Sequence, residues 1–562
     1  MNKYFLAPLR KLVWGGFMKK SSEGKKTILL YSPILLGLLI MLPRLLSPNF
    51  GFFDDAVTLT RAQEIWAGPW NLVISADGGR FRPLYWLYYA FLYRLFGLHP
   101  LGFFIGNLIL FLVLIFGVIR LALALGINRK TAWLVGLVFA LAGPVTENIY
   151  TLSKPELLQA FWILLLLASC GTYLRIKTWH WKIPFILLMA GLAFVACITK
   201  ETGILLIPAS FISLAIYWLW GKLNRQMDRR ILNRRIILWW ASLIGGIAYF
   251  IVSSIFLNSS LMSVRSDNFN FQPAWLYSQF RILLDWMIRD YLYLLPLCLG
   301  ALVALFKKSN QAVVPLLVEC GCWILIWAAV YIPWLYIPEY YLFPVALIAA
   351  ILCGLLVSLN LTLLQARQVE RIIAWASLGV SALLFAITLP NLVTNARLQM
   401  TLDRANAEML KYVVDYAPQG STVLINIQQS NEYVTEFTLW VNQISNRPDI
   451  KVDTFHDQDL ATAEAGNQAI WIISPHLENQ FYPSVRMGIY QNTSTAWNQD
   501  LATHLNGKGE QIEDIRYSFP IFIFDPMRFF CPLTPSLSYC QVPNAPLDHR
   551  ELSYGWSIER LP

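Results

Sequence analysis

The chain has 562 residues, of which 56% are hydrophobic, 14% aromatic and only 14% charged. Ordinary soluble domains have about 25% charged residues, so this composition argues against a soluble protein and indicates an integral membrane protein. The formal net charge is +10, but Lys and Arg lie mostly in short loops between apolar runs. That distribution is the positive-inside pattern of membrane proteins and excludes a nucleic-acid-binding surface as its explanation.

Apolar runs close to 20 residues long predict about eleven membrane-spanning helices. Every second loop between them is rich in Lys and Arg, which places the N-terminal segment 1–26 in the cytoplasm and the tail after the last span outside. The first span has a long basic flank and no small-residue cleavage site, so we expect a retained anchor. The spans are predicted at residues 27–46, 100–125, 131–150, 156–174, 183–199, 203–220, 236–257, 290–306, 312–332, 338–358 and 372–391.

Two domains follow from this pattern: a transmembrane domain over residues 27–392, with its first outer loop at 47–99, and an extracytoplasmic domain over 393–562. The second domain is polar and alternates strand-like runs with a helical stretch, which predicts a small α/β fold. The predicted fold class is therefore a polytopic α-helical membrane protein with a C-terminal soluble α/β domain. Its strands are expected at 421–427, 469–473 and 520–524, and its helix at 432–444.

Two of the eight cysteines, Cys531 and Cys540, lie in this outer domain. Because the compartment outside the membrane is oxidising, we predict a disulfide between them.

Acids and bases gather at the outer ends of the predicted spans. A charged side chain costs roughly 2.5–3.5 kcal/mol at the centre of a membrane helix, so ionisable residues kept close to the hydrocarbon usually line a cavity or a substrate path. The acids Asp54 and Asp55 begin the first outer loop, and Arg80 and Arg82 end it. The other members at this side are Glu147, Lys154, Glu156, Lys200, Glu201 and Glu339.

A site that mixes carboxylates with cations suits the transfer of a sugar from a lipid phosphate. A carboxylate accepts the proton of an attacking hydroxyl group as general base. Arg and Lys stabilise the charge that develops on the departing phosphate. Nucleotide sugars are not supplied outside the membrane, so a polyprenyl-phosphate sugar is the expected donor.

The run Arg80-Phe81-Arg82-Pro83-Leu84, with the following segment as far as Asn107, resembles the first-loop signature of the GT-C membrane glycosyltransferases. It is most similar to the O-mannosyltransferases that carry tetratricopeptide repeats and to their bacterial relatives. The segments 140–158 and 199–203 also resemble this group, and the resemblance spans about residues 30–360. It implies a polyprenyl-phosphate-dependent glycosyltransferase that inverts the sugar.

The resemblance also assigns roles to residues. It implies that the acidic pair Asp54 and Asp55 supplies the catalytic carboxylate, with Asp54 as the base. It matches Arg82 and Lys200, and less closely Arg80, to the cations that hold the donor phosphate. Residues that would position the acceptor or substrate are Glu147, Lys154, Glu156, Glu201, Glu339 and Tyr340.

Two departures from the family pattern concern the acceptor and the phosphate contacts. Relatives have Glu-Arg-Tyr-Leu before the tenth span, where this chain has Glu339-Tyr340-Tyr341-Leu342 and so lacks one arginine. The repeats are absent, and the C-terminal domain takes their place. The acceptor class, whether protein, lipid or glycan, therefore stays open.

Simpler explanations exist for each of these residues. Asp54 and Asp55 suit the N-terminus of a helix as a cap and a first-turn charge. Arg80 and Arg82 suit anchors that reach the interface, and Lys200 with Glu201 suits a solvated break between spans.

For the whole protein, the alternatives are a flippase for lipid-linked sugars and a membrane scaffold. A transporter would have functional charges in the middle of its spans, but Glu319 is the only clear acid in mid-span.

We expect no cofactor, because cations of the chain suffice to neutralise the phosphate, although the carboxylates also suit a divalent metal ion. The expected partners are the lipid donor, the bilayer and the acceptor, and no nucleic acid. We favour the bacterial plasma membrane as the location.

Overall fold

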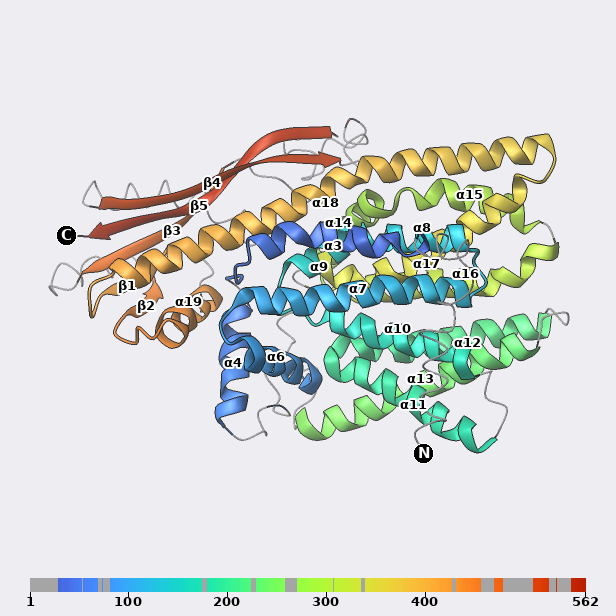
Figure 1. The fold of residues 1–562 in the computed structure, drawn as a ribbon, viewed down its shortest axis with the longest axis horizontal. Coiled ribbons are helices and arrows are strands. Elements are labelled where there is room, and N and C mark those ends of the chain that lie inside the picture. Colours follow the sequence, from blue (N-terminus) through green and yellow to red (C-terminus); the bar gives the residue numbers. More distant parts are fainter. Residues whose placement is uncertain are drawn as a thin grey trace.

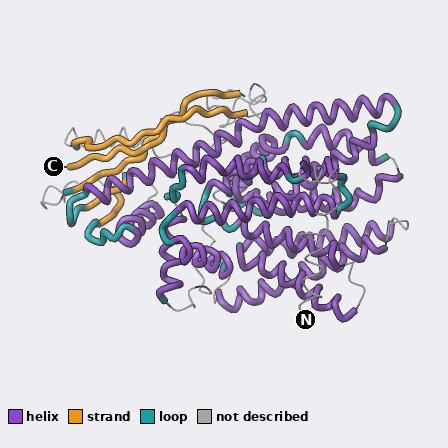
Figure 2. Tube along the Cα trace, in the orientation of Figure 1, coloured by secondary structure: helices purple, strands orange, loops and turns teal. Residues whose placement is uncertain are grey.

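The computed structural model is a long bundle of helices with a sheet domain at one end (Figure 1). Helices make up most of the chain and strands are confined to its C-terminal part (Figure 2). The structure describes residues 29–52, 54–68, 73, 81–173, 179–223, 229–257, 270–306, 308–334, 339–426, 431–455, 469–478, 509–524, 532 and 547–561.

The helices confirm the predicted polytopic class. In the described part of the chain, seven helices are long and apolar enough to cross a membrane, or up to nine if each of two bent pairs is one span. Two shorter apolar helices, α3 (Ser32–Leu46) and the start of α10 (Glu156–Tyr173), add to these. Each of the predicted spans coincides with one of these helices or bent pairs. The side of the membrane on which each loop lies stays a prediction.

The bundle is built from helices that carry apolar residues on most of their surface, as expected where both lipid and protein surround them. Besides α3 and α10, its helices are α7 (Pro100–Ala124), α8 (Arg129–Ala140), α9 (Gly143–Tyr150), α11 (Trp179–Thr199), α12 (Leu206–Leu223), α13 (Arg229–Leu257), α14 (Pro273–Tyr291), α15 (Leu294–Leu305), α16 (Val314–Ala329), α17 (Phe343–Leu363) and α18 (Gln368–Tyr416). Short 3₁₀ turns η1 (Glu201–Leu205), η3 (Lys308–Val313) and η4 (Glu339–Leu342) precede α12, α16 and α17.

Two features shape the end of the bundle that carries the first outer loop. That loop forms helices α4 (Asp55–Ala67) and α6 (Pro83–Phe96), which pack against each other beside the sheet domain (Figure 1). The span 131–150 breaks at residues 141–142, where Pro144 cannot continue the helix, and α9 turns away from α8 by 54°. The chain that links α9 to α10 therefore lies next to the first outer loop.

Helix α18 joins the two predicted domains without a break. It has 49 residues and continues 24 residues beyond the predicted boundary at 392, to Tyr416. Its second half lies along strands β4 and β5 (Figure 1). The side chain of Asn406 on α18 accepts hydrogen bonds from the Tyr554 hydroxyl at 3.0 Å and from the Trp556 indole at 2.8 Å, and all three residues are buried.

The C-terminal domain is a mixed five-stranded sheet in the order β2-β1-β3-β5-β4. The first three strands are parallel, and β5 pairs antiparallel with β3 and β4. The predicted strands correspond to β1, β3 and the end of β4, and the predicted helix to α19 and the π-helical turn η5; β2 and β5 were not predicted. The elements are β1 (Thr422–Ile425), α19 (Asn431–Thr438), η5 (Leu439–Ile444), β2 (Lys451–Thr454), β3 (Ile470–Glu478), β4 (Glu510–Phe524) and β5 (Leu547–Leu561).

The predicted disulfide between Cys531 and Cys540 falls outside the described residues. It stays a prediction.

We expect Gly245→Ala to lower the thermal unfolding midpoint of the detergent-solubilised protein. A Cβ atom at Gly245 on α13 would lie 2.2 Å from the Ala190 carbonyl oxygen of α11, so the two helices would have to separate. Such overpacking costs about 1–3 kcal/mol. Gly321→Ala on α16 is the control, because a Cβ there meets nothing within 4 Å and alanine favours a helix. Equal midpoints for the two variants would contradict the close packing of α11 on α13.

Candidate active site

The two acids of the first outer loop have different environments. Asp54 stands at the N-cap position of α4, but its side chain accepts no hydrogen bond from the described first turn of that helix. Its φ of 66° lies in the left-handed region, which is costly for residues other than glycine. Its side chain is 47% exposed. Asp55 is 2% exposed and accepts a hydrogen bond from the Gly51 amide at 2.7 Å. Asp54 is therefore open to a substrate, whereas Asp55 is enclosed beneath it.

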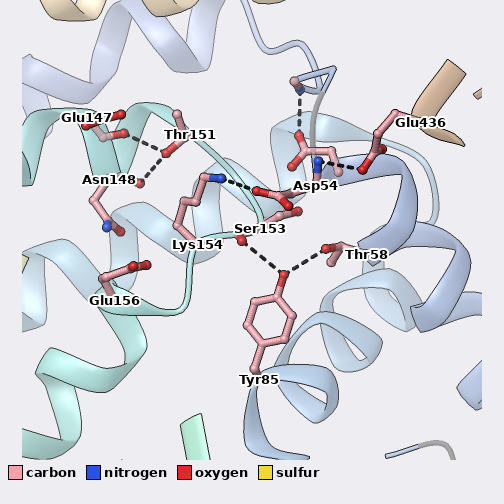
Figure 3. A network of polar contacts seen from close by, with 12 residues as sticks. Asp54, Thr58, Tyr85, Glu147, Asn148, Thr151, Ser153, Lys154, Glu156 and Glu436 are labelled. Carbon is pink, nitrogen blue, oxygen red and sulfur yellow. Dashed lines mark hydrogen bonds and ion pairs between the residues drawn. The ribbon is translucent and has the colours of Figure 1, made fainter. Parts of the chain in front are cut away.

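Lys154 reaches Asp54 from the link between α9 and α10. Its ammonium group lies 2.5 Å from the Asp54 carboxylate and its side chain is 12% exposed. Figure 3 shows the two side chains pointing toward each other. Ser153, the residue before Lys154, also has a left-handed backbone, with a φ of 55°. Unfavourable backbone conformations of this kind gather at functional sites, where the surrounding structure holds them.

Tyr85 on α6 connects the two segments. Its hydroxyl group donates to the Ser153 carbonyl at 3.1 Å and lies 2.8 Å from the Thr58 hydroxyl of α4 (Figure 3). Burial raises the pKa of Tyr85 to about 12, while Arg82, the Thr58 hydrogen bond and Lys154 lower it and Asp54 raises it. The phenol is therefore neutral at physiological pH, and both Asp54 and Arg82 are within its electrostatic reach.

Arg82 is a buried cation at the start of α6. Its side chain is 8% exposed, and the guanidinium lies over the rings of Tyr85 at 4.7 Å and Trp86 at 5.4 Å. It forms no hydrogen bond and no ion pair within the part of the chain that the structure describes, and its Nε is buried without a partner. This residue is not an anchor that extends to water, because it faces inward. A second cation that the sequence did not single out, Arg61 of α4, lies 5.3 Å from the Trp86 ring.

Lys200 is paired within the protein. Its ammonium group forms an ion pair with Glu156 at the start of α10, and both side chains are buried. It also lies 4.2 Å from the centre of the Tyr341 ring. The break between α11 and η1 is therefore not a solvated one at Lys200. The next residue, Glu201, and Arg82 are both within electrostatic reach of Tyr249 on α13. The segment that carries Lys200 therefore borders the same region as Arg82.

The other predicted site residues are placed less completely. Glu147 is buried on α9 (Figure 3). Glu339 and Tyr340 belong to η4, and only their backbone is described. Arg80 lies outside the described residues. The structure thus brings Asp54, Lys154 and Arg82 around Tyr85, and Glu156 with Lys200 beside them. The roles assigned to all of the predicted site residues stay predictions.

Four charged residues at this site were missed by the sequence reasoning: Arg61, Arg44, Asp403 and Glu436. Arg44 of α3 forms a fully buried ion pair with Asp403 of α18. Glu436 of α19, 3% exposed, accepts a hydrogen bond from the Asp54 backbone amide at 3.0 Å (Figure 3). Arg44 had a signal, because Lys and Arg are scarce at the predicted outer ends of the spans. The two acids had none, because their partners lie more than 350 residues away in sequence.

The mid-span acid Glu319 has partners in the bundle. It accepts a hydrogen bond from the Tyr217 hydroxyl at 2.6 Å, and Arg235 lies 3.6 Å away. Glu319 and Arg235, with Trp239 and Trp323, line a cavity of about 40 Å³. The cavity is at the end of the bundle away from α4, and its volume suits a water molecule rather than a sugar or a lipid.

Among the described residues, no three His, Cys, Asp or Glu side chains are placed to hold a metal ion together. The metal requirement stays open to a chelator assay.

No family model matches the chain, and no curated protein is similar to it in sequence. Several solved structures are similar to it. ArnT from Cupriavidus metallidurans, bound to undecaprenyl phosphate, is 12% identical with a TM-score of 0.48, over 78% of this chain and 92% of ArnT. The oligosaccharyltransferase of Archaeoglobus fulgidus with a tethered acceptor peptide is 12% identical with a TM-score of 0.46, over 79% of this chain and 69% of that one.

The same archaeal enzyme, named AglB, is also similar in its complex with an inhibitory peptide and a dolichol phosphate, again at 12% identity and a TM-score of 0.46, over 79% of this chain and 69% of that one. At this identity, and with TM-scores below 0.5, these likenesses do not place the chain in a family.

We expect the free energy of unfolding to depend on pH through Asp55. Burial raises the pKa of Asp55 to about 7, outweighing the hydrogen bonds from Ser153 and Gly51 that lower it. The native state therefore holds a proton that the unfolded chain releases near pH 4. The stability that this proton provides is complete below about pH 4, is lost as pH rises through 7, and amounts to at most about 4 kcal/mol.

Asp55→Asn should remove this contribution, so that the difference in unfolding free energy between wild type and variant changes between pH 4 and 8. Denaturant titrations at several pH values measure it. A difference independent of pH would show that Asp55 titrates normally.

Proposed function

We propose that the protein is a GT-C-like glycosyltransferase, which transfers one sugar from a polyprenyl-phosphate donor to an acceptor outside the membrane, with inversion. The observation that carries this proposal is Arg82, a buried guanidinium that no anion of the described chain neutralises. A buried charge without a counter-ion is unfavourable, so the position calls for an anionic ligand. Phosphate, like carboxylate, is an anion that a guanidinium binds in a bidentate manner.

The lipid character of the donor follows from where Arg82 lies. It begins α6 and packs beside Phe81 and Trp86, both buried, and Phe81 stacks on Phe256 at the end of α13 at 5.1 Å between ring centres. Phe256 is 45% exposed, at the end of a helix that is apolar enough to cross a membrane. A phosphate at Arg82 would therefore sit close to the surface of the hydrocarbon, as a phosphate on a polyprenyl chain does.

Asp54 is the base in this proposal. It is the carboxylate of the cluster that is open to solvent, and Lys154 orients it. The acceptor oxygen attacks the anomeric carbon while Asp54 takes its proton, and the bond between that carbon and the phosphate oxygen breaks. The bonding electrons leave with the polyprenyl phosphate. A single displacement of this kind inverts the anomeric centre.

Asp55 supports Asp54 rather than reacting itself. It is enclosed, and its carboxylate accepts from the Gly51 amide and the Ser153 side chain, so it ties the segment before α4 to the link between α9 and α10. Lys200 completes the cationic side of the cluster, with Glu156 fixing its position.

Asp54→Asn should reduce sugar transfer by at least 100-fold, because loss of a general base typically costs 10²–10⁴-fold in rate. The assay supplies mannosyl-phosphoryl-undecaprenol with a labelled sugar to the purified protein, with cell membranes as the acceptor source. Glu408→Gln is the matched control: Glu408 lies on α18, is 44% exposed and pairs with Arg404. Transfer that persists in Asp54→Asn at the rate of the control would refute Asp54 as the base.

Arg82→Gln should weaken the binding of undecaprenyl phosphate by about 10-fold or more, since a hydrogen bond to a charged group contributes about 1.5–3 kcal/mol. Arg82→Lys should recover only part of the affinity, because a lysine cannot bind in a bidentate manner. The shift of the thermal midpoint with lipid phosphate concentration measures the affinity. Arg516→Gln, at an exposed pair with Asp514 in β4, is the control. Equal affinities for Arg82→Gln and this control would contradict the binding of the phosphate by Arg82.

A further inference from the structure

The C-terminal domain contacts the catalytic loop through aromatic rings. Phe52, two residues before Asp54, lies 6.2 Å from Phe437 and 6.3 Å from Trp556 between ring centres, and these three side chains are buried. The Trp440 indole donates to the Phe52 carbonyl at 3.2 Å, and its ring lies 5.8 Å from that of Phe50. The segment that leads into α4 is therefore packed onto α19, η5 and β5.

This packing places a carboxylate at the backbone of Asp54. Glu436 precedes Phe437 in α19, is 3% exposed, and its Oε1 accepts the Asp54 amide at 3.0 Å. The position is electrostatically suitable, because the N-terminus of α4 carries the positive end of the helix dipole. Figure 3 shows Glu436 on one side of Asp54 and Lys154 on the other.

Asp54 needs such a contact because of its backbone. Its φ of 66° lies in a region that L-residues adopt less readily than the right-handed or extended ones, so contacts with neighbouring groups help to hold it. The hydrogen bond from its amide fixes the peptide group before it, and the ion pair with Lys154 fixes its side chain. A change in φ would rotate the carboxylate away from Lys154.

We propose that Glu436 is a positioning residue of the C-terminal domain, which holds Asp54 in the left-handed conformation that directs its carboxylate to Lys154. The inference rests on the proposed function for its effect on catalysis, but the structural effect is independent of it. The sheet domain thus contributes a residue to the active site.

Hydrogen exchange tests the contact without any substrate. Overlapping peptides across residues 49–60, analysed by mass spectrometry, should show exchange at the Asp54 amide at least 10-fold faster in Glu436→Ala than in wild type. Glu436→Gln keeps an acceptor oxygen and should stay within about 3-fold of wild type. Glu408→Ala and Glu408→Gln remove a contact between α18 and Tyr517 of β4, away from Asp54, and should leave this amide unchanged. Unchanged protection in Glu436→Ala, with a thermal midpoint equal to wild type, would overturn the proposal.

Kinetics then separate positioning from general disruption. Glu436→Ala should lower kcat for sugar transfer about 10- to 100-fold while its affinity for undecaprenyl phosphate stays within 2-fold of wild type, and Glu436→Gln should recover most of the rate. An equal loss of lipid-phosphate affinity in Glu436→Ala and Glu436→Gln would contradict a local role. If wild type transfers no sugar at all, the proposed function fails, whereas the exchange experiment still decides whether Glu436 holds Asp54.

Discussion

The buried ion pair between Arg44 and Asp403 holds together the frame on which the site is built. Arg44 ends the first membrane helix, Asp403 belongs to α18, and both side chains are almost inaccessible to solvent. The same guanidinium donates to the Asn49 carbonyl at 3.1 Å and lies 4.2 Å from the Phe104 ring. Loss of one member of such a pair leaves an uncompensated charge, at a cost of about 3–5 kcal/mol. The first span, the long helix and the entry into α4 are therefore held in one arrangement.

That arrangement separates the roles of two adjacent carboxylates. Asp55 faces the protein, where burial raises its pKa to about 7 and the negative charge of Asp403 contributes in the same direction. Asp54 faces outward, with a lysine beside it. Two neighbouring acids with different surroundings commonly divide a structural and a reactive task. Here the division results from the left-handed turn at Asp54, because it directs consecutive side chains to opposite sides.

The parts of this structure that local patterns determine could be predicted from the sequence. The spans followed from apolar length, and the alternation of basic loops placed Asp54 and Lys154 at the same ends of the spans, where the structure pairs them. The contact of Glu436 with Asp54 depends on the packing of a separate domain, so no local pattern indicates it. Strand β5 did have a signal in Tyr554, Trp556 and Ile558, which alternate and are buried. The continuation of α18 beyond residue 392 had little signal in the sequence, because this polar half of the helix is stabilised by packing on β4 and β5.

The charges of the site match the proposed reaction at both of its ends. Asp54 forms an ion pair with Lys154 and Glu156 forms one with Lys200, whereas Arg82 forms no ion pair within the described part of the chain. A sugar phosphodiester carries one negative charge and would balance the charge of Arg82. After transfer the phosphate is a monoester with about two negative charges. Asp54 has then taken up a proton and no longer neutralises Lys154. Lys154 can then face the second phosphate charge, which matters because uncompensated charge is costly where water is excluded. A flippase breaks no bond, so the phosphate gains no second charge. It therefore needs no carboxylate that takes up a proton and gives up its ion pair with a lysine.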